Sequence, residues 1–272
     1  MTLTDRQKSI FQRRFPIGNA GGFISISLML SALSYGAPAR AQMDEIEVYD
    51  AEINAPGEFS VALHNNYTPS GRKTADIPGG IVPNHALNGV PEFAYGVTDW
   101  WEVGAYVPVY TLTSGGRAEF DSVKLRSLFV VPHAEQRDFF YGVNFELSYN
   151  ARHWEPTRFS TEIRPIIGVR IGPVDLIANP IIEFGFAGLG SIGITPAERI
   201  AYNVSPNWSV GIEHYADYGL LRHLQDSNGQ QQLVFGVVGY KSEENEIQFG
   251  VGHGFTRASG DVVLKLIIGH TF

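Results

Sequence analysis

The chain has 272 residues, of which 44% are hydrophobic and 18% are charged, and it contains no cysteine. This length supports a sizeable folded core, and the absence of cysteine excludes disulfides and thiolate metal sites. The formal net charge of −8 at pH 7 argues against a nucleic-acid partner.

The first 41 residues have the features of a secretory signal peptide. A basic region between residues 6 and 14 precedes an apolar stretch at 21–33, and Ala39-Arg40-Ala41 supplies a small-residue cleavage site. The alternative, an N-terminal membrane anchor, requires a longer apolar stretch. Cleavage before Gln42 removes five of 20 basic residues and one of 28 acidic residues, which leaves 15 and 27 and makes the net charge −12.

Residues 42–57 precede the first segment with clear alternation. The acidic stretch Asp44–Asn54 is compatible with a first strand or with a periplasmic lead-in, and Asn54-Ala55-Pro56-Gly57 is a turn signal. We predict a periplasmic lead-in at 42–57, followed by a β-barrel at 58–272.

From residue 58 onward, apolar residues alternate with small or polar residues in segments separated by turn signals. Successive side chains of a strand point to opposite faces, so this period of two predicts strands. The clearest example is 138–152, where Phe139 and Tyr141 share one face and Phe140 and Asn144 share the other. The predicted strands are 58–67, 87–97, 100–112, 119–133, 138–152, 160–172, 174–187, 194–204, 207–218, 230–241 and two in a closing hairpin within 245–272.

The predicted connections alternate between short and long. The short ones lie at 98–99, 134–137, 173, 205–206 and 242–244, and the long ones at 68–86, 113–118, 153–159, 188–193 and 219–229; only the last outer loop, 257–260, is tight. Outer-membrane barrels have an even strand number, short periplasmic turns and longer extracellular loops, whereas a soluble β-sandwich has no reason for this asymmetry. We therefore predict an all-β fold, a single antiparallel transmembrane β-barrel of about 12 strands in the bacterial outer membrane.

Aromatic residues gather near both ends of the predicted strands. At the short-turn ends lie Trp100, Trp101, Trp208 and Phe272, and at the long-loop ends lie Tyr149 and Trp154. Amphipathic rings concentrate at the two membrane interfaces of a barrel. We therefore predict that these six residues contact outer-membrane lipid at its interfaces.

Two stretches, 45–60 (EIEVYDAEINAPGEFS) and 90–110 (VPEFAYGVTDWWEVGAYVPVY), resemble outer-membrane proteins grouped with the meta-cleavage pathway of phenol degradation. This resemblance implies an outer-membrane transporter for aromatic compounds, and it carries no catalytic motif. The closing hairpin, which ends on Phe272, is also similar to the last strands of bacterial outer-membrane barrels. That similarity implies recognition of the C-terminal strand by the barrel-assembly machinery.

The alternation predicts that many charged side chains point into the lumen. These are Glu58, His64, Glu92, Glu102, Lys124, Arg126, Glu146, Arg152, Glu162, Arg164, Arg170, Asp175, Glu183, Glu213, Asp217 and Lys265. Interspersed charges of both signs fit a constriction that selects solutes, and they also fit a salt-bridge ladder that fills the barrel. As candidate selectivity residues we select Lys124, Arg126, Glu146, Arg164, Arg170 and Glu183. The Gly- and Pro-rich loop 68–86 is compatible with an inward constriction or with a mobile tip.

The sequence predicts no catalytic, metal or cofactor site. No serine sits beside a histidine within one strand, no Gly-x-Ser-x-Gly motif occurs, and four of eight histidines are expected to face lipid or the interfaces. The predicted function is therefore non-enzymatic: passive passage of small solutes, including aromatic or hydrophobic compounds. A non-conducting structural barrel and an outer-membrane lipid-modifying enzyme remain the alternatives.

Overall fold

The computed structural model describes residues 45–186 and 188–272, so the predicted signal peptide at 1–41 and residues 42–44 lie outside the described residues. The elements are β1 (Phe59–Ser70), β2 (Leu87–Thr98), β3 (Trp101–Leu112), β4 (Ala118–Val130), η2 (Ala134–Gln136), β5 (Phe139–Asn150), β6 (Phe159–Ile171), β7 (Val174–Asn179), β8 (Ile182–Gly185), η3 (Leu189–Ser191), β9 (Ile192–Ile194), β10 (Ala197–Asn203), β11 (Trp208–Asp217), β12 (Gly219–Leu220), β13 (His223–Leu224), β14 (Gln231–Lys241), β15 (Asn245–Gly254) and β16 (Val262–Thr271). Within the described ranges, no helix has the length and apolar character needed to cross a membrane.

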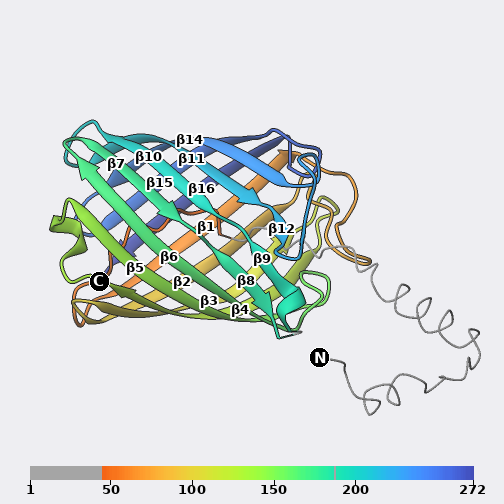
Figure 1. Cartoon of the computed structure of the whole chain (residues 1–272), viewed down its shortest axis with the longest axis horizontal. Coiled ribbons are helices and arrows are strands. Elements are labelled where there is room, and N and C mark those ends of the chain that lie inside the picture. The colour runs from red at the N-terminus through yellow and green to blue at the C-terminus, as the bar shows by residue number, and fades with distance from the viewer. Residues whose placement is uncertain (1–44, 187) are drawn as a thin grey trace, which may run out of the picture. The chain divides into compact units, whose positions relative to one another are not determined.

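The strands form one antiparallel sheet that closes on itself (Figure 1). Consecutive pairing runs from β1 to β7 and then through β10, β11, β14, β15 and β16, and β16 pairs with β1. The pieces β7 and β8 are two halves of one strand, as are β9 and β10, because each pair of halves keeps one register against its neighbours. Counted in this way the barrel has 12 strands, which confirms the predicted fold.

The interruption in these two strands has a local cause in the sequence. Continuing the common register of β7–β10 and β8–β9 places Pro180 opposite Pro196. Proline has no backbone N–H and cannot donate to the ladder, so hydrogen bonding is interrupted on both strands at the same level. Pairing is maintained on either side, and the Thr195 backbone N–H still donates to the Ile181 carbonyl at 3.1 Å.

Side chains alternate between an apolar exterior and a mixed interior. On β5, Phe139, Tyr141 and Phe145 are exposed by 55%, 54% and 40%, whereas Phe140 and Asn144 are fully buried. Exposed aromatic and aliphatic side chains recur on the outside of the other strands. Such an exterior faces lipid, because a chain in water would bury these rings.

One position of β3 departs from the predicted alternation. The sequence pattern places Val109 on the exterior face with Val107, but Val109 is fully buried. The register against β4 shifts between Tyr106 and Val109, and such a bulge adds a residue that turns the following side chains over. The prediction for Val109 was therefore wrong, whereas Val107 is exposed as predicted.

The lipid-facing surface leads to a first testable prediction. We expect Phe145→Arg, at the centre of β5, to destabilise the barrel by about 2–4 kcal/mol, because a charge at the bilayer midplane loses its hydration. The control is Phe139→Arg at the first position of the same strand, which should cost only about 0–1 kcal/mol near the interface. Urea unfolding of the protein refolded into vesicles measures both values. Equal losses for the two variants would contradict a lipid-facing β5.

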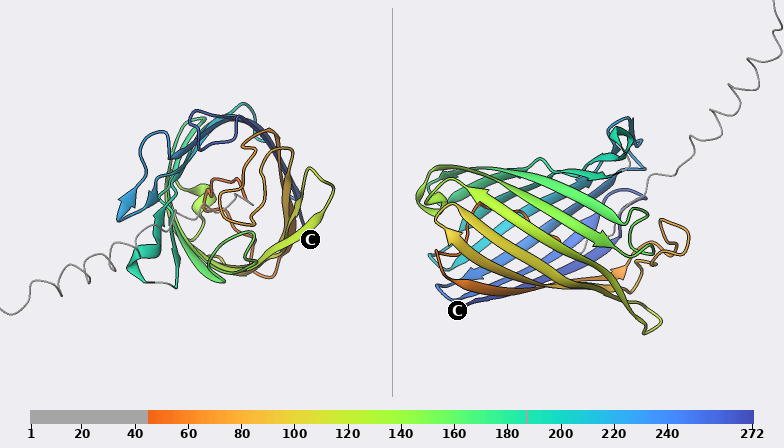
Figure 2. Two further views of the ribbon diagram at one scale, coloured as in Figure 1. Left: turned by 90° about the vertical axis from the view of Figure 1, so that its right-hand side faces the viewer. Right: turned by 90° about the horizontal axis from the view of Figure 1, so that it is seen from below.

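The two ends of the barrel differ in their connections, as predicted. The short-turn end carries residues 99–100, 172–173, 204–207 and 242–244, together with the 131–138 connection that contains η2. The long-loop end carries 71–86, 113–117, 151–158 and 218–230, and Figure 2 shows these loops gathered opposite the C-terminus. The short strands β12 and β13 extend the sheet at the long-loop end by pairing onto β9.

Residues 45–54 form no strand and lie inside the barrel. Figure 2 shows this red-orange segment within the ring of strands. Ile46, Val48, Tyr49 and Ala51 are buried in a cluster with side chains of eight strands, namely β4, β5, β6, β7, β10, β11, β14 and β16. The sequence predicts a periplasmic lead-in at 42–57, whereas residues 45–54 of this stretch lie in the lumen. We call residues 45–54 the luminal segment.

Candidate functional site

An apolar layer fills the lumen around the luminal segment. Its wall consists of Leu128, Val130, Val131, Ala134, Phe140, Ile166, Ile177, Ile181, Ala197, Tyr215, Leu233, Phe235 and Val263. Two of its rings lie over glycines of the adjacent strand: a Cβ on Gly168 would lie 2.0 Å from Phe140, and one on Gly252 would lie 2.5 Å from Phe235. These glycines allow large rings to lie flat on the inner wall and to leave room for the segment.

Polar contacts hold the luminal segment to several strands. The Tyr49 N–H donates to Asn179 Oδ1 at 2.8 Å, and Asn179 Nδ2 donates back to the Tyr49 carbonyl at 3.0 Å. Lys265 Nζ donates to the Ile46 carbonyl at 3.1 Å, and Arg199 Nη2 contacts Asp50 Oδ2 at 3.0 Å. The first three contacts satisfy backbone groups of Tyr49 and Ile46, which secondary structure would otherwise satisfy.

A second apolar cluster narrows the lumen towards the long-loop end. It contains Ile81 from loop 71–86 and Trp154 from loop 151–158, which pack on Val90, Tyr106 and Val109. Loop 71–86 therefore contributes to an inward constriction. Trp154 is only 4% exposed, so its predicted position at the membrane interface is wrong. It belongs to a loop, where strand alternation gives no orientation, and the loop turns into the lumen.

The other predicted interface aromatics lie on the outer surface. Trp100 and Trp208 are exposed by 43% and 51%, and Trp208 packs on Tyr240 with ring centroids 5.1 Å apart. Trp101 stacks on Trp100 and Phe129, and its Nε1 donates to Ser127 Oγ at 2.9 Å. Tyr149 and Phe272 are also exposed, at 44% and 72%. Their position at lipid interfaces stays a prediction.

Between the two apolar clusters lies a group of paired charges centred on Arg126. Its Nε contacts Glu92 Oε1 at 2.6 Å, and its Nη2 contacts Glu102 Oε1 at 2.7 Å. Glu92 Oε2 lies 2.9 Å from Nε2 of His64, which is 1% exposed. The guanidinium of Arg126 also lies 5.9 Å from the Tyr49 ring of the luminal segment. Charges on three strands therefore meet the segment at one level of the lumen.

Arg164 on β6, two strands from Arg126, also binds the luminal segment. Its Nε contacts Glu162 at 2.7 Å, and its Nη1 contacts Glu45 Oε1 at 3.4 Å and the Glu47 carbonyl at 3.3 Å. Its guanidinium lies 4.3 Å from the centroid of the Tyr49 ring. Tyr49 thus lies between the guanidinium groups of Arg126 and Arg164, an arrangement favoured by cation–π attraction.

Of the six predicted selectivity residues, four lie near one another. Lys124 Nζ lies 3.8 Å from Glu146 Oε2 on the adjacent strand. Glu146 is the register partner of Arg126, and Arg164 lies on the strand beyond Glu146. All four side chains face the lumen and are at most 13% exposed.

The remaining two predicted residues lie elsewhere. Arg170 is at the short-turn end, where Nη1 donates to the carbonyls of Ala134 and Arg137 at 2.6 and 2.9 Å. This arginine anchors the β4–β5 connection. Glu183 lies on β8, on the long-loop side of the proline interruption, and accepts a hydrogen bond from Thr195 Oγ1 at 3.2 Å. Alternation correctly gives the face of a side chain but does not give its height along the barrel.

A cavity of about 260 Å³ opens beside the luminal segment at the short-turn end. Carboxylates dominate its lining: Glu47, Asp50, Glu52, Glu58, Glu92, Glu102, Glu243, Glu244 and Glu246. Its basic residues are Arg126 and Lys241. This excess of negative charge attracts cations and repels small anions at that mouth.

The luminal segment brings four residues to the site that were not predicted from the sequence: Glu45, Glu47, Tyr49 and Asp50. The alternation of Glu45 and Glu47 with Ile46 and Val48 was a usable signal, since it has the same period of two as the barrel strands. That signal indicates extended backbone with one apolar face, and it does not distinguish a wall strand from a segment within the lumen.

The chain shares its fold with solved outer-membrane channels. It matches an outer-membrane channel from Pseudomonas putida F1 with a TM-score of 0.54 and 14% identity, over 84% of this chain and 100% of that one. It matches KdgM porin with a TM-score of 0.52 and 10% identity, over 78% of this chain and 99% of that one. It matches NanC porin with a TM-score of 0.52 and 6% identity, over 78% of this chain and 98% of that one. No protein-family profile and no curated protein sequence matches. The prediction of an outer-membrane β-barrel is therefore confirmed at the level of the fold.

Proposed function

We propose that this protein is an outer-membrane channel for the passive passage of small solutes and that the luminal segment limits its opening. The observation that carries the proposal is a lipid-facing barrel whose interior holds charged residues, a cavity and a segment that is not part of the wall. A barrel of 12 strands encloses more space than its own side chains fill, and here the luminal segment occupies part of that space.

The solutes that we propose are small molecules with an aromatic or hydrophobic part. The resemblance of 45–60 and 90–110 to outer-membrane proteins of phenol degradation supports this class. Tyr49 and Tyr106, whose hydroxyl groups are hydrogen-bonded to each other, and Trp154 place buried aromatic rings inside the barrel. Aromatic rings bind other rings by stacking and by edge contacts.

Lys124, Arg126, Glu146 and Arg164 are the proposed selectivity residues. The two guanidinium groups attract anionic groups of a solute, and the neighbouring carboxylates limit how tightly those groups bind. Arg170 and Glu183 lie too far towards opposite ends to share this step, and we propose that they support the wall and the long-loop half of the lumen. The C-terminal strand is the proposed contact with the barrel-assembly machinery.

Ion selectivity tests this assignment. We expect Arg126→Ala and Arg164→Ala each to shift the reversal potential of single channels in a salt gradient towards cation selectivity, because each removes a positive charge from the narrow part of the lumen. The control is Arg158→Ala, since Arg158 lies in the loop beside the exterior ring of Tyr149. Unchanged selectivity in both lumen variants would refute the assignment of these residues.

The main alternative is a structural barrel that does not conduct. Its support is the filled lumen, in which two apolar clusters and the luminal segment meet. Planar-bilayer recording decides between the two functions. A channel produces conductance steps in the intact chain or after the segment is weakened, whereas a structural barrel produces none in either case while a control porin conducts.

A further inference from the structure

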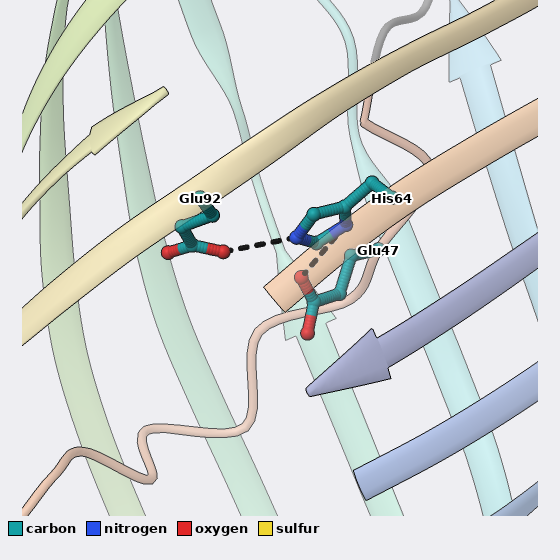
Figure 3. A group of neighbouring side chains, drawn as sticks. All are labelled: Glu47, His64 and Glu92. Atoms are coloured by element: carbon teal, nitrogen blue, oxygen red, sulfur yellow. Dashed lines mark hydrogen bonds and ion pairs between the residues drawn. The ribbon is translucent and has the colours of Figure 1, made fainter. Parts of the chain in front are cut away.

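A side-chain group at the junction of the luminal segment and the barrel wall has the features of a metal site. Figure 3 shows His64 of β1 between two carboxylates, Glu92 of β2 and Glu47 of the luminal segment. His64 Nε2 lies 2.9 Å from Glu92 Oε2, and His64 Nδ1 lies 3.9 Å from Glu47 Oε2. Candidate ligand atoms of the three residues lie within 4.8 Å of one another.

The contacts of Glu92 determine which histidine nitrogen is available to an ion. Arg126 holds the other oxygen of Glu92 at 2.6 Å, which keeps Glu92 an ionised acceptor. Nε2 of His64 must then carry the proton and donate it to Glu92. In a neutral imidazole this leaves Nδ1 with a free lone pair. A carboxylate that orients a histidine through its second nitrogen is the usual support of a metal-ligating histidine.

Nδ1 of His64 is buried, has no hydrogen-bond partner and points towards Glu47. An unpaired nitrogen in a side chain that is 1% exposed is unfavourable unless something binds it. Two ligands on a tetrahedral zinc ion at bonds of about 2.0–2.1 Å are about 3.4 Å apart. The observed 3.9 Å between Nδ1 and Glu47 Oε2 therefore needs a small movement of one flexible side chain.

Local charge and access also favour a divalent cation. Four carboxylates, those of Glu45, Glu47, Glu92 and Glu102, surround this level of the lumen together with two guanidinium groups, those of Arg126 and Arg164. Both His64 and Glu47 line the 260 Å³ cavity, through which an ion and its waters reach the site. One oxygen of Glu45 is buried without a partner and is a further candidate ligand.

We propose that His64 and Glu47 bind a divalent transition-metal ion such as Zn²⁺, with Glu92 positioning His64, and that the ion fastens the luminal segment to the barrel wall. Imidazole with carboxylate selects zinc-like ions over Mg²⁺ or Ca²⁺, which prefer oxygen ligands. The ion joins β1 of the wall to the luminal segment, which is not itself a wall strand. A bound ion therefore holds the luminal segment inside the lumen. The binding itself does not rest on the proposed channel function.

Calorimetric titration of Zn²⁺ into the refolded chain in detergent tests this site. We expect one saturable ion per chain, at least about tenfold weaker binding in His64→Gln and Glu47→Gln, and about 10–100-fold weaker binding in Glu92→Gln. The matched control is His253→Ala, because that ring is exposed on β15, so its removal should leave the affinity unchanged. Heat-modified mobility on gels verifies that each variant is folded.

A second measurement follows the segment itself. The chain has no cysteine, so Ala51→Cys introduces a single thiol on the buried luminal segment. We expect Zn²⁺ to slow thiol labelling at this position, and Glu47→Gln to abolish the effect. Absence of saturable binding, or equal affinity in the intact chain and His64→Gln, would overturn the site and leave His64 as a bridge between two carboxylates. Either outcome is independent of whether the barrel conducts.

Discussion

Removal of residues 45–53 is expected to raise the single-channel conductance of the refolded barrel by at least about threefold, because a 12-strand wall without this segment encloses an open lumen. The segment now joins an apolar layer to which most strands contribute, and Tyr49 lies between Arg126 and Arg164. Without it, those two guanidinium groups line a wider, wetter passage. Planar-bilayer recording in symmetric salt measures the change.

Two further variants make this prediction decisive. Shortening the exposed 113–117 turn by Ser114 and Gly115 removes residues without touching the lumen, so its conductance should equal that of the intact chain. Ile46→Asp with Val48→Asp keeps the segment's length but expels it from the apolar layer, which guards against misfolding of the deletion. If both segment variants fold and neither conducts more than the intact chain, the segment does not limit passage.

The second large effect concerns stability. Lys265 on β16 and Glu213 on β11 form an ion pair inside the lumen, and both side chains are completely inaccessible to solvent. Replacing Lys265 by Met is expected to destabilise the barrel by about 3–5 kcal/mol, because the Glu213 carboxylate is left buried without its cation. Lys265 also donates to the Ile46 carbonyl, so the same change loosens the luminal segment. Urea unfolding in vesicles measures the loss.

A double variant separates the effect of the unpaired Glu213 charge from the effect of replacing the Lys265 side chain. Lys265→Met combined with Glu213→Gln should recover most of the lost stability, since no unpaired charge remains buried. The matched control is Arg117→Met, which breaks the exposed pair with Glu119 and should cost no more than about 1 kcal/mol. A single Lys265→Met variant as stable as the intact chain would show that water reaches Glu213.

Much of the fold follows from alternation in the sequence. Two constraints make the pattern strict: successive strand side chains, such as Phe139 and Phe140, point to opposite faces, and one of these faces contacts lipid and must be apolar. The pattern fails where one of them is missing. Val109 follows a bulge that reverses the faces, and Trp154 lies in a loop that turns inward.

The contacts within the candidate site were harder to predict from the sequence than the strands of the barrel wall. That Arg126 and Arg164 face the lumen follows from alternation, but their partners depend on the stagger between strands, which the sequence does not reveal. Arg170 shares their face and strand pattern, yet it lies at the short-turn end and holds a turn. The position of the luminal segment could not be predicted for another reason: a wall strand and an extended segment inside the barrel have the same alternating sequence pattern.

The contact between Lys265 and Ile46 joins residues 219 positions apart, and Lys241 contacts Glu52 across 189 positions. Neighbouring strands meet through short local hairpins, which form in microseconds, whereas contacts between the two ends of a chain form slowly. The seam between β1 and β16 and the contacts of the luminal segment therefore belong to the last stage of folding. The two late events are the entry of the luminal segment and the closure of the β1–β16 seam. Their order decides whether the closed barrel holds the luminal segment in its lumen.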